Sequence, residues 1–376
     1  MNGTHVSPAA VARPSSIPDV QEAVRAAGDV RSAEGDVRPV GGRTKTALST
    51  PRPGDLVLDL SGLSGVLEYE PDECTFTALA GTPLRDVEAM LAQHGQALPF
   101  EAPFASRGAT LGGVVASGLN GPGRYRYGGI RDFLIGARFV DGDGRLLRGG
   151  GKVVKNAAGF YLHHLLLGSA GRLGTLVELT FKVFPAPRAR LTLVARYPSL
   201  ADALAQVVSL RQSSYELDAL DVAPDGRVWV RIAGEAAALD ARAATLTGIL
   251  GGSNVTREEP AAAEAFWTEA RDCAWAQHGI LARVATTPSA LAGLDAALGA
   301  AGAGRRYSAG GEIAWVDWPG DSGALDRLLQ DRGLSGLLVL GSGVEDPIVG
   351  VRPDPAFMSR VKSVLDRGGT YAGSRK

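Results

Sequence analysis

The chain has 376 residues, of which 45% are hydrophobic, and its formal net charge at neutral pH is −1. This length is greater than one ordinary core requires and suggests two domains. The balanced charge argues against a nucleic-acid-binding protein, because such proteins present a basic surface. No segment approaches 18 consecutive apolar residues, and the N-terminus lacks a signal-peptide pattern. We therefore expect a cytoplasmic protein that meets a membrane only through partners.

The cysteine content argues against a metal centre. Cys74 and Cys273 are the two cysteines, they lie far apart, and no Cys-x-x-Cys motif occurs. An iron–sulfur cluster or a zinc site made by this chain alone is therefore not expected, and a reducing compartment fits.

The first half of the chain alternates apolar runs with amphipathic segments. We predict one helix over residues 15–28, ended by Gly28, and another over residues 82–95, with Pro83 near its start. Strands are predicted from short apolar runs bounded by Gly and Pro, at 36–40, 55–61 and 75–81 and within 132–150 and 175–187.

The second half repeats one order of elements twice. Strands are predicted over 190–198, 215–223 and 227–234, and again over 280–288, 304–310, 312–319 and 336–342. Helices are predicted over 199–212, 236–250, 289–302 and 322–333, with further helices over 259–279 and 354–369. Two successive β-α-β-β-α units predict one antiparallel sheet with helices on one face.

Two glycine-rich loops carry the chemical signal. Residues 39–49, PVGGRTKTALS, can turn backbone N–H groups toward an anion, and the Thr44 hydroxyl adds a donor. Residues 108–118, GATLGGVVASG, offer a second group of amides from Thr110 to Gly113. Taken alone, the first loop could be a surface turn and the second a tightly packed helix. Together they suit a diphosphate, although neither G-x-x-x-x-G-K-[ST] nor G-x-G-x-x-G occurs.

Three stretches resemble a known family in order and spacing. PVGGRTK (39–45), ATLGGVVASGLNGPGRYRYGGIRD (109–132) and KVVKNAAGFYLHHLLLGSAGRLGTLVELTFKVFP (152–185) are similar to the FAD domain of the vanillyl-alcohol-oxidase or PCMH-type flavoproteins. Within that superfamily, the chain resembles the FAD-binding flavoprotein subunits of bacterial glycolate oxidase. The resemblance is specific up to about residue 187 and weaker beyond, where the chain is similar to the family's cap.

The resemblance implies an α+β fold with three parts. These are a two-part PCMH-type FAD-binding domain over residues 1–187, a cap domain over 188–345 with an antiparallel sheet covered by helices, and a C-terminal helical tail over 346–376. The cap is the substrate and partner domain, built from the two β-α-β-β-α units.

The resemblance also implies which residues bind FAD. The first loop would hold the diphosphate, through Gly41, Gly42, Arg43, Thr44 and Lys45. The second would hold the ADP half and the ribityl chain, through Thr110, Leu111, Gly112, Gly113, Ser117 and Gly118. The following turn would add Tyr127, Gly128, Ile130 and Asp132. The backbone beside the flavin would come from Gly171, Gly174, Thr175 and Val177.

Two positions bear on the flavin chemistry. Some relatives attach FAD covalently through a histidine directly after the paired glycines, where this chain has Arg43, so non-covalent FAD is expected. Lys155 is the one candidate catalytic residue, since a cation near the flavin would stabilise its anionic reduced form. A structural ion pair is the alternative for Lys155.

The chain also departs from the family's pattern. The 2-hydroxyacid dehydrogenases of the superfamily carry a histidine-rich motif in the cap that binds metal and removes a proton. The five histidines here form no such cluster: His5, His94, His163, His164 and His278. The family's usual C-terminal segment is also missing, and no metal ligand set is expected.

Three hypotheses follow. The first is an FAD-dependent oxidoreductase subunit of a glycolate (2-hydroxyacid) oxidase complex, which acts with a second FAD subunit and an iron–sulfur subunit. The second is a stand-alone FAD oxidase or dehydrogenase of another alcohol or hydroxy acid, with Arg283, Arg305, Tyr307 and Glu312 as available polar groups in the cap. The third is a non-catalytic assembly subunit with structural FAD.

Overall fold

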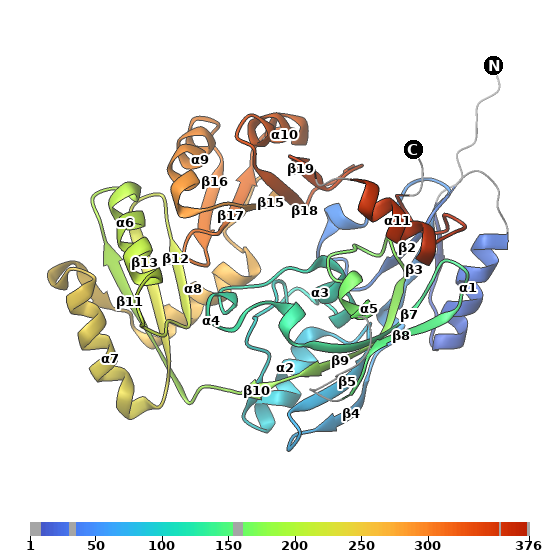
Figure 1. The fold of residues 1–376 in the computed structure, drawn as a ribbon, viewed down its shortest axis with the longest axis horizontal. Helices are drawn as coiled ribbons and strands as arrows, with labels where there is room; N and C mark the ends of the chain where they lie inside the picture. The colour runs from blue at the N-terminus through green and yellow to red at the C-terminus, as the bar shows by residue number, and fades with distance from the viewer. Residues whose placement is uncertain (1–8, 30–34, 153–160, 353–354, 374–376) are drawn as a thin grey trace.

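The computed structural model describes residues 9–29, 35–152, 161–352 and 355–373. They form two parts, one built from the N-terminal half of the chain and one from the following segment, placed next to each other (Figure 1). Both parts combine helices with sheets, so the predicted α+β class is confirmed.

The first part contains three sheets. The strands are β1 (Ala10–Ala12), β2 (Val37–Val40), β3 (Leu56–Asp59), β4 (Val66–Glu70), β5 (Thr75–Leu79), β6 (Gln96–Ala97), β7 (Leu134–Val140), β8 (Leu146–Gly150), β9 (Thr175–Lys182) and β10 (Phe184–Pro185). A three-stranded parallel sheet has the order β1-β3-β2, and a five-stranded antiparallel sheet has the order β4-β5-β9-β7-β8. A short antiparallel pair joins β10 to β6.

Helices of the first part are α1 (Ile17–Asp29), α2 (Leu84–Gln93), α3 (Leu111–Ser117), α4 (Arg124–Tyr127) and α5 (Leu162–Leu165), with 3-10 turns η1 (Thr46–Leu48), η2 (Leu60–Gly62) and η3 (Ile130–Asp132). The start of α1 lies where its sequence predicts. The Asp19 carboxylate accepts hydrogen bonds from the backbone N–H groups of Ser15 and Ser16, which have no partner inside the helix. Val20 and Val24 are buried on the inner side of this helix.

The second part is built on one nine-stranded antiparallel sheet. Its strands are β11 (Ala189–Arg196), β12 (Ala219–Val222), β13 (Arg227–Gly234), β14 (Val255–Arg257), β15 (Ile280–Ala285), β16 (Gly304–Ser308), β17 (Ile313–Trp318), β18 (Ser335–Leu340) and β19 (Ile348–Gly350). Their order in space is β14-β11-β13-β12-β16-β17-β15-β18-β19. The two central strands, β12 and β16, join two halves that follow one another along the chain.

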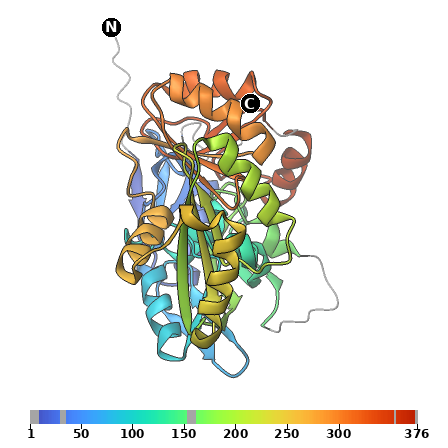
Figure 2. The ribbon, with the colours of Figure 1, turned by 90° about the vertical axis from the view of Figure 1, so that its left-hand side faces the viewer.

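Helices lie on both faces of this sheet, in unequal numbers. The outer face is covered by α6 (Leu200–Arg211), α7 (Ala236–Ile249), α9 (Pro288–Ala300) and α10 (Ser322–Gln330), which share one apolar cluster with the sheet. Figure 2 shows this side of the molecule facing the viewer. The other face packs against α8 (Pro260–Asp272) and the first part. The helix α8 is shorter than predicted, because Cys273 adopts a left-handed backbone with φ of +50°.

The chain finally returns to the first part. Helix α11 (Pro355–Leu365) lies beside it, and Tyr371 forms a parallel bridge with Val37 of β2. The Lys362 ammonium donates to the carbonyl of Arg172 at 2.6 Å and pairs with Asp366. The C-terminal segment is therefore fixed to the first part by buried polar contacts.

The two parts share one core. A single apolar cluster contains Phe104 and Leu119 from the first part together with Leu281, Trp315 and Val339 from the nine-stranded sheet. Within the described residues, no helix is both long enough and apolar enough to span a bilayer.

Candidate functional site

A cavity of about 570 Å³ opens between the first part and the edge of the second. Its walls come from the loop after β2, the start of α3 and residues 169–174. Gly279 and the turn Gly341–Gly343 close it from the second part. This volume lies in the range of small-molecule and cofactor sites, so the cavity is the candidate site.

Close backbone packing explains the paired glycines of the first loop. A Cβ atom on Gly41 would lie 2.3 Å from the Thr110 hydroxyl, and one on Gly42 would lie 1.8 Å from the carbonyl oxygen of Gly108. Only glycine fits at either position. The two glycine-rich loops recognised in the sequence therefore contact each other and form one wall of the cavity.

Arg43 is not a free cation, because its side chain forms an ion pair. Its backbone is left-handed, with φ of +51°, and its guanidinium pairs with Asp59 at 3.2 Å. About half of the side chain is exposed. The Asp59 carboxylate also accepts hydrogen bonds from Ser61, so Arg43 shares its carboxylate partner.

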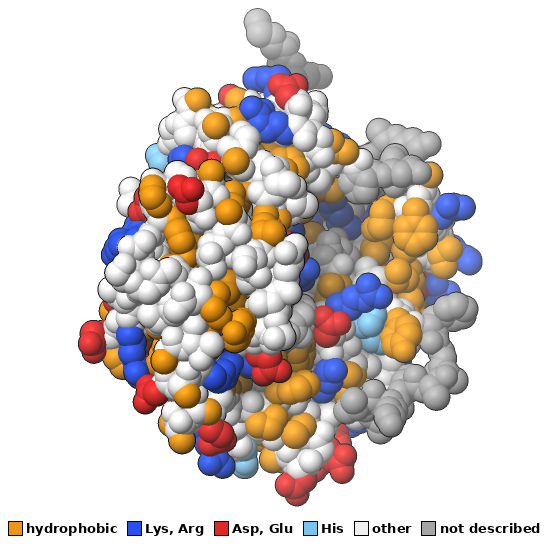
Figure 3. Space-filling view, turned by 60° about the vertical axis from the view of Figure 1, so that its left-hand side comes forward, with side chains coloured by type: hydrophobic (Ala, Val, Ile, Leu, Met, Phe, Trp, Pro, Cys, Tyr) orange, Lys and Arg blue, Asp and Glu red, His pale blue; other side chains and the backbone are white. Residues whose placement is uncertain are grey.

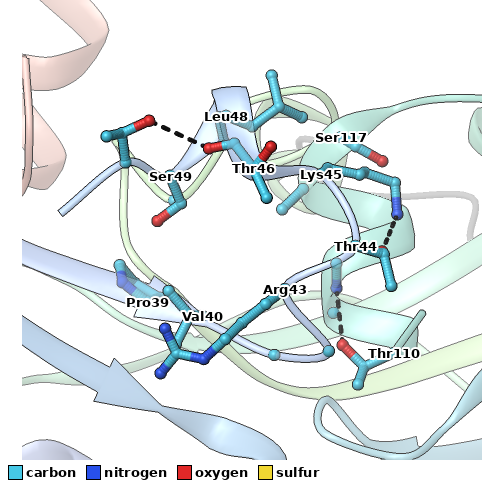
Figure 4. A pocket seen from close by; sticks show the side chains of 18 of the residues that line it. Pro39, Val40, Arg43, Thr44, Lys45, Thr46, Leu48, Ser49, Thr110 and Ser117 are labelled. Atoms are coloured by element: carbon cyan, nitrogen blue, oxygen red, sulfur yellow. Dashed lines mark hydrogen bonds between the residues drawn. The ribbon is translucent and has the colours of Figure 1, made fainter. Parts of the chain in front are cut away.

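Lys45 is the unpaired cation at the cavity wall. Its side chain is buried, and its ammonium lies 3.3 Å from the Thr44 hydroxyl and 5.4 Å from the centre of the Phe104 ring (Figure 4). Burial, and next the nearby Arg107, lower the pKa of Lys45 to about 8. Within the described residues, no carboxylate hydrogen-bonds to it. The charge of Asp272 raises the pKa of Lys45, but more weakly than burial lowers it, so a buried ammonium with no carboxylate hydrogen-bonded to it suits a bound anionic group.

Helix α3, which belongs to the second glycine-rich loop, continues this wall. Thr110 caps it, accepting a hydrogen bond from the N–H of Gly113 at 3.3 Å, and Ser117 donates to the carbonyl of Val114 (Figure 4). Gly112 lies against Ala80, where a Cβ would approach to 3.0 Å. The glycines thus bring the helix close to the neighbouring strand and leave the cavity open above it.

Most of the residues singled out in the sequence meet at this cavity. Those that line it are Gly41, Gly42, Arg43, Thr44, Lys45, Thr110, Gly112, Gly113, Ser117, Gly171 and Gly174. Those that do not line it are Leu111, Gly118, Tyr127, Gly128, Ile130, Asp132, Thr175 and Val177. Lys155 lies outside the described residues.

The residues away from the cavity have structural contacts. Leu111, Ile130 and Val177 are buried in the apolar clusters. The Thr175 hydroxyl contacts the Tyr371 hydroxyl at 2.9 Å, and the Asp132 carboxylate accepts from the N–H of Gly129. These residues therefore support the segments that line the cavity and do not line it themselves.

Sequence reasoning missed the contribution of the second part. Gly279 and the turn Gly341–Gly343 line the cavity although they lie more than 200 residues from the first loop. The repeated glycine of Gly341-Ser342-Gly343 was the available signal, since both glycines have positive φ. The Gly341 N–H donates to the Thr46 hydroxyl, which ties this turn to the first loop.

The histidines lie elsewhere. His163 is buried, and burial, with the adjacent His164, lowers the pKa of His163 to about 4. His278 pairs with Asp317 at 2.7 Å. Among the described residues, no three His, Cys, Asp or Glu side chains could together hold a metal ion.

Comparison with known proteins connects this site to a cofactor. Residues 8–150 match the family described as an FAD binding domain. The glycolate oxidase subunit GlcE of Escherichia coli (strain K12) is 37% identical over 246 residues, which are 65% of this chain and 66% of that protein. Residues 8–150 therefore belong to this family of FAD-binding domains. The chain is an FAD-binding protein, as the sequence predicted.

Other relatives share the same region. A D-2-hydroxyglutarate dehydrogenase of Xanthomonas citri is 34% identical over 58% of this chain and 46% of that protein. The glycolate oxidase subunit GlcD of Bacillus subtilis is 34% identical over 42% of this chain and 33% of that protein. The matches thus span about two thirds of GlcE and less than half of the other two proteins.

The fold extends the likeness to nearly the whole chain. The solved structure of an alkyldihydroxyacetonephosphate synthase superposes with a TM-score of 0.71 over 96% of this chain and 75% of that one, at 17% identity. The likeness in fold therefore includes the second part, which confirms the predicted fold class.

The cavity fits the cofactor on two observations. Lys45 offers a buried ammonium without a carboxylate partner, which suits a phosphate. The packed glycines of both loops leave backbone N–H groups without bulky side chains beside them. When bound, FAD supplies two-electron acceptance from a substrate carbon.

Proposed function

We propose that this chain is the FAD-binding subunit of an oxidoreductase that converts small 2-hydroxyacids such as glycolate to 2-oxoacids. Its relatives are named for glycolate, D-2-hydroxyglutarate and D-lactate, which share a hydroxyl group next to a carboxylate. In this reaction two electrons and two protons leave the substrate, and the electrons go to the flavin and then to a partner. The partners in the proposal are a second FAD subunit and an iron–sulfur subunit.

The FAD-binding residues in this proposal follow the cavity. Gly41, Gly42, Thr44 and Lys45 would hold the diphosphate, and residues of α3 would lie along the ribityl chain. The segments 1–187, 188–345 and 346–376 would serve as FAD domain, cap and tail. We further propose a cytoplasmic location, with any contact to the inner face of the membrane made through the partners.

One observation favours a carboxylate substrate. Arg283 lies on β15, on the side of the sheet that faces the first part, because Leu281 two residues earlier packs in the shared core. Burial, and next Arg124 of the first part, lower the pKa of Arg283. Neither guanidinium has a carboxylate partner among the described residues. Two guanidiniums whose charges interact and that have no carboxylate partner suit a carboxylate ligand, which binds arginine by paired hydrogen bonds.

The other polar groups of the cap are already paired. Arg305 and the Tyr307 hydroxyl share the Asp295 carboxylate, and Glu312 pairs with Arg211. They therefore offer less to a substrate than Arg283 does. Since no described histidine cluster lies in the cap, we propose that full turnover needs the partner subunits.

The experiment is the visible spectrum of the purified chain under anaerobic conditions, before and after glycolate, D-lactate or 2-hydroxyglutarate. We expect an oxidised flavin that is released by acid precipitation, because Arg43 replaces the linking histidine. We expect bleaching only after the partner subunits are added. Bleaching of the chain alone would favour a stand-alone enzyme. A flavin that stays oxidised in the complete assembly would favour a structural cofactor.

Arg283→Met tests the carboxylate contact. We expect it to keep FAD but to raise the substrate concentration needed for half-maximal flavin reduction by about tenfold or more. Arg227→Met on the same sheet is the control, because Arg227 is exposed and paired with Asp225. Equal behaviour of the two variants would remove Arg283 from the proposal.

A further inference from the structure

Helix α11 presents an uncovered apolar face. Phe357 is 57% exposed, Met358 is 44% exposed and Val364 is 61% exposed. Phe357, Arg360 and Val364 follow a spacing of three and four residues, so they lie along one side of the helix. The adjacent side of the helix packs inward through Val361 and Leu365, which are four residues apart.

The charges around this face have one sign. Arg360 and Arg367 are exposed, whereas the acidic residue of the stretch, Asp366, is buried and paired with Lys362. Figure 3 shows apolar side chains together with Lys and Arg side chains in this region, on the right of the view. Phe, Met and Arg are the residue types that protein interfaces favour. We call Phe357, Met358, Arg360, Val364 and Arg367 the α11 face.

The α11 face belongs to an element that contacts the wall of the FAD cavity. Lys362, on the inner side of the helix, donates to the carbonyl of Arg172, which lies between Gly171 and Gly174 of the cavity wall. Tyr371, just beyond the helix, bridges to Val37 of the strand that leads into the first glycine loop. A protein bound on α11 is therefore connected by direct contacts with residues 169–174 of the cavity wall and with the strand before the first glycine loop.

We infer that the α11 face is the docking site for a second flavoprotein subunit of the GlcD type, which presents acidic side chains around an apolar patch. This inference rests on the proposed function and names the surface by which the assembly forms. A second copy of this chain fits less well, because a two-fold contact would place Arg360 and Arg367 against their own copies. An acidic partner surface neutralises these charges and covers the apolar side chains.

The test measures binding of the FAD-loaded chain to the purified GlcD-type subunit encoded in the same genome. Phe357→Glu/Val364→Glu is expected to weaken binding about 100-fold, because it places charge in the centre of the contact. Arg360→Glu/Arg367→Glu is expected to weaken it about tenfold, and the wild-type affinity should fall with added salt. All four side chains are exposed, so FAD content and unfolding temperature should stay unchanged.

Leu67→Glu and Arg188→Glu are the matched controls. Leu67 on β4 is 54% exposed, which is close to Phe357 and Val364, and the Arg188 side chain is 79% exposed; both residues lie away from α11. Both should bind the partner as the wild type does. If the Phe357/Val364 variant also binds normally, the α11 face is wrong while the proposed function stands.

Two further outcomes are informative. If the wild-type chain binds no GlcD-type subunit, both the docking site and the proposed assembly are overturned. If the chain associates with itself and the α11 variants abolish only that association, the occupant is a second copy and the inference is again wrong.

Discussion

Lys45 shows how one buried charge links stability, cofactor binding and pH. In the protein without FAD, burial lowers the pKa of Lys45 from 10.5 to about 8. Between these values the unfolded chain binds more protons than the folded one, so this residue makes stability rise with pH across that window. A bound phosphate has the opposite effect, because it favours the charged ammonium.

We therefore predict that FAD binding weakens above pH 8, by up to about tenfold per pH unit, as Lys45 loses its proton. Lys45→Met should bind FAD more weakly at pH 7. In this variant, the affinity for FAD should not fall above pH 8, and the stability of the FAD-free protein should not rise with pH in that range. Fluorescence titration of FAD from pH 7.0 to 9.5, with urea unfolding of the FAD-free protein, measures both. Lys182→Met is the control, since Lys182 lies on β9 outside the cavity. A Lys45→Met protein that keeps the wild-type pH slope would contradict this prediction.

Strand β13 carries an ion pair that joins the two parts. Arg231 is 4% exposed, and it pairs with Asp218 of the second part and with Glu101 of the first part, at 2.8 Å for the latter. Burial, the largest single effect, raises the pKa of Glu101. The charge and hydrogen bond of Arg231, together with the charges of Arg190 and Arg271, outweigh it and hold this pKa below its ordinary value. Asp218 also lies 3.7 Å from Arg190, and Glu101 also accepts a hydrogen bond from the N–H of Gly123, but Arg231 is the closest cation to both carboxylates.

Arg231→Met should lower the free energy of unfolding by about 3–5 kcal/mol, because it removes the nearest cation from the buried Asp218 carboxylate and from the largely buried Glu101 carboxylate. Arg257→Met is the matched control: its pair with Asp240 is exposed on both sides, so a loss below about 1 kcal/mol is expected. Urea denaturation of the two variants and the wild type measures the difference. Similar losses would show that the pair between the parts is no stronger than a surface pair.

The elements themselves were largely predictable from sequence, whereas their pairing was not. The period of apolar residues and the flanking Gly and Pro placed α1, α2 and most cap strands within a few residues. The end of α8 was not predictable, because Cys273 has a left-handed backbone only in the context of its packing. Strands β12 and β16 pair through residues 85 positions apart in the sequence, Val222 and Tyr307. A local sequence pattern cannot predict such a pairing.

The candidate site, like the fold, was predictable from the sequence only in part. Both loops of the first part were recognisable, because tight glycine packing leaves a mark in the sequence. The wall from Gly341–Gly343 was not, because only the folded chain brings that turn to Thr46. Lys45 was assigned by resemblance, but its lack of a carboxylate partner required the structure.

At the scale of the whole molecule, the shared core predicts that both parts unfold together. Its apolar cluster runs from Phe76 and Phe181 in the first part to Trp315 and Val339 in the second. Splitting the parts would expose this cluster along with the Arg231 pair, so a state with only one part folded is disfavoured.

The chain carries separate natural probes for this prediction. All five tryptophans lie between residues 229 and 318, in the second part, whereas the bound flavin reports on the cavity, whose lining comes mostly from the first part. We expect tryptophan emission and flavin release to give one coincident transition in urea. Excess FAD should shift both midpoints upward together, because a ligand that binds only the folded state stabilises everything that unfolds with it. Two separated midpoints, with the tryptophan transition insensitive to FAD, would mean that the second part folds independently and that the shared core contributes little.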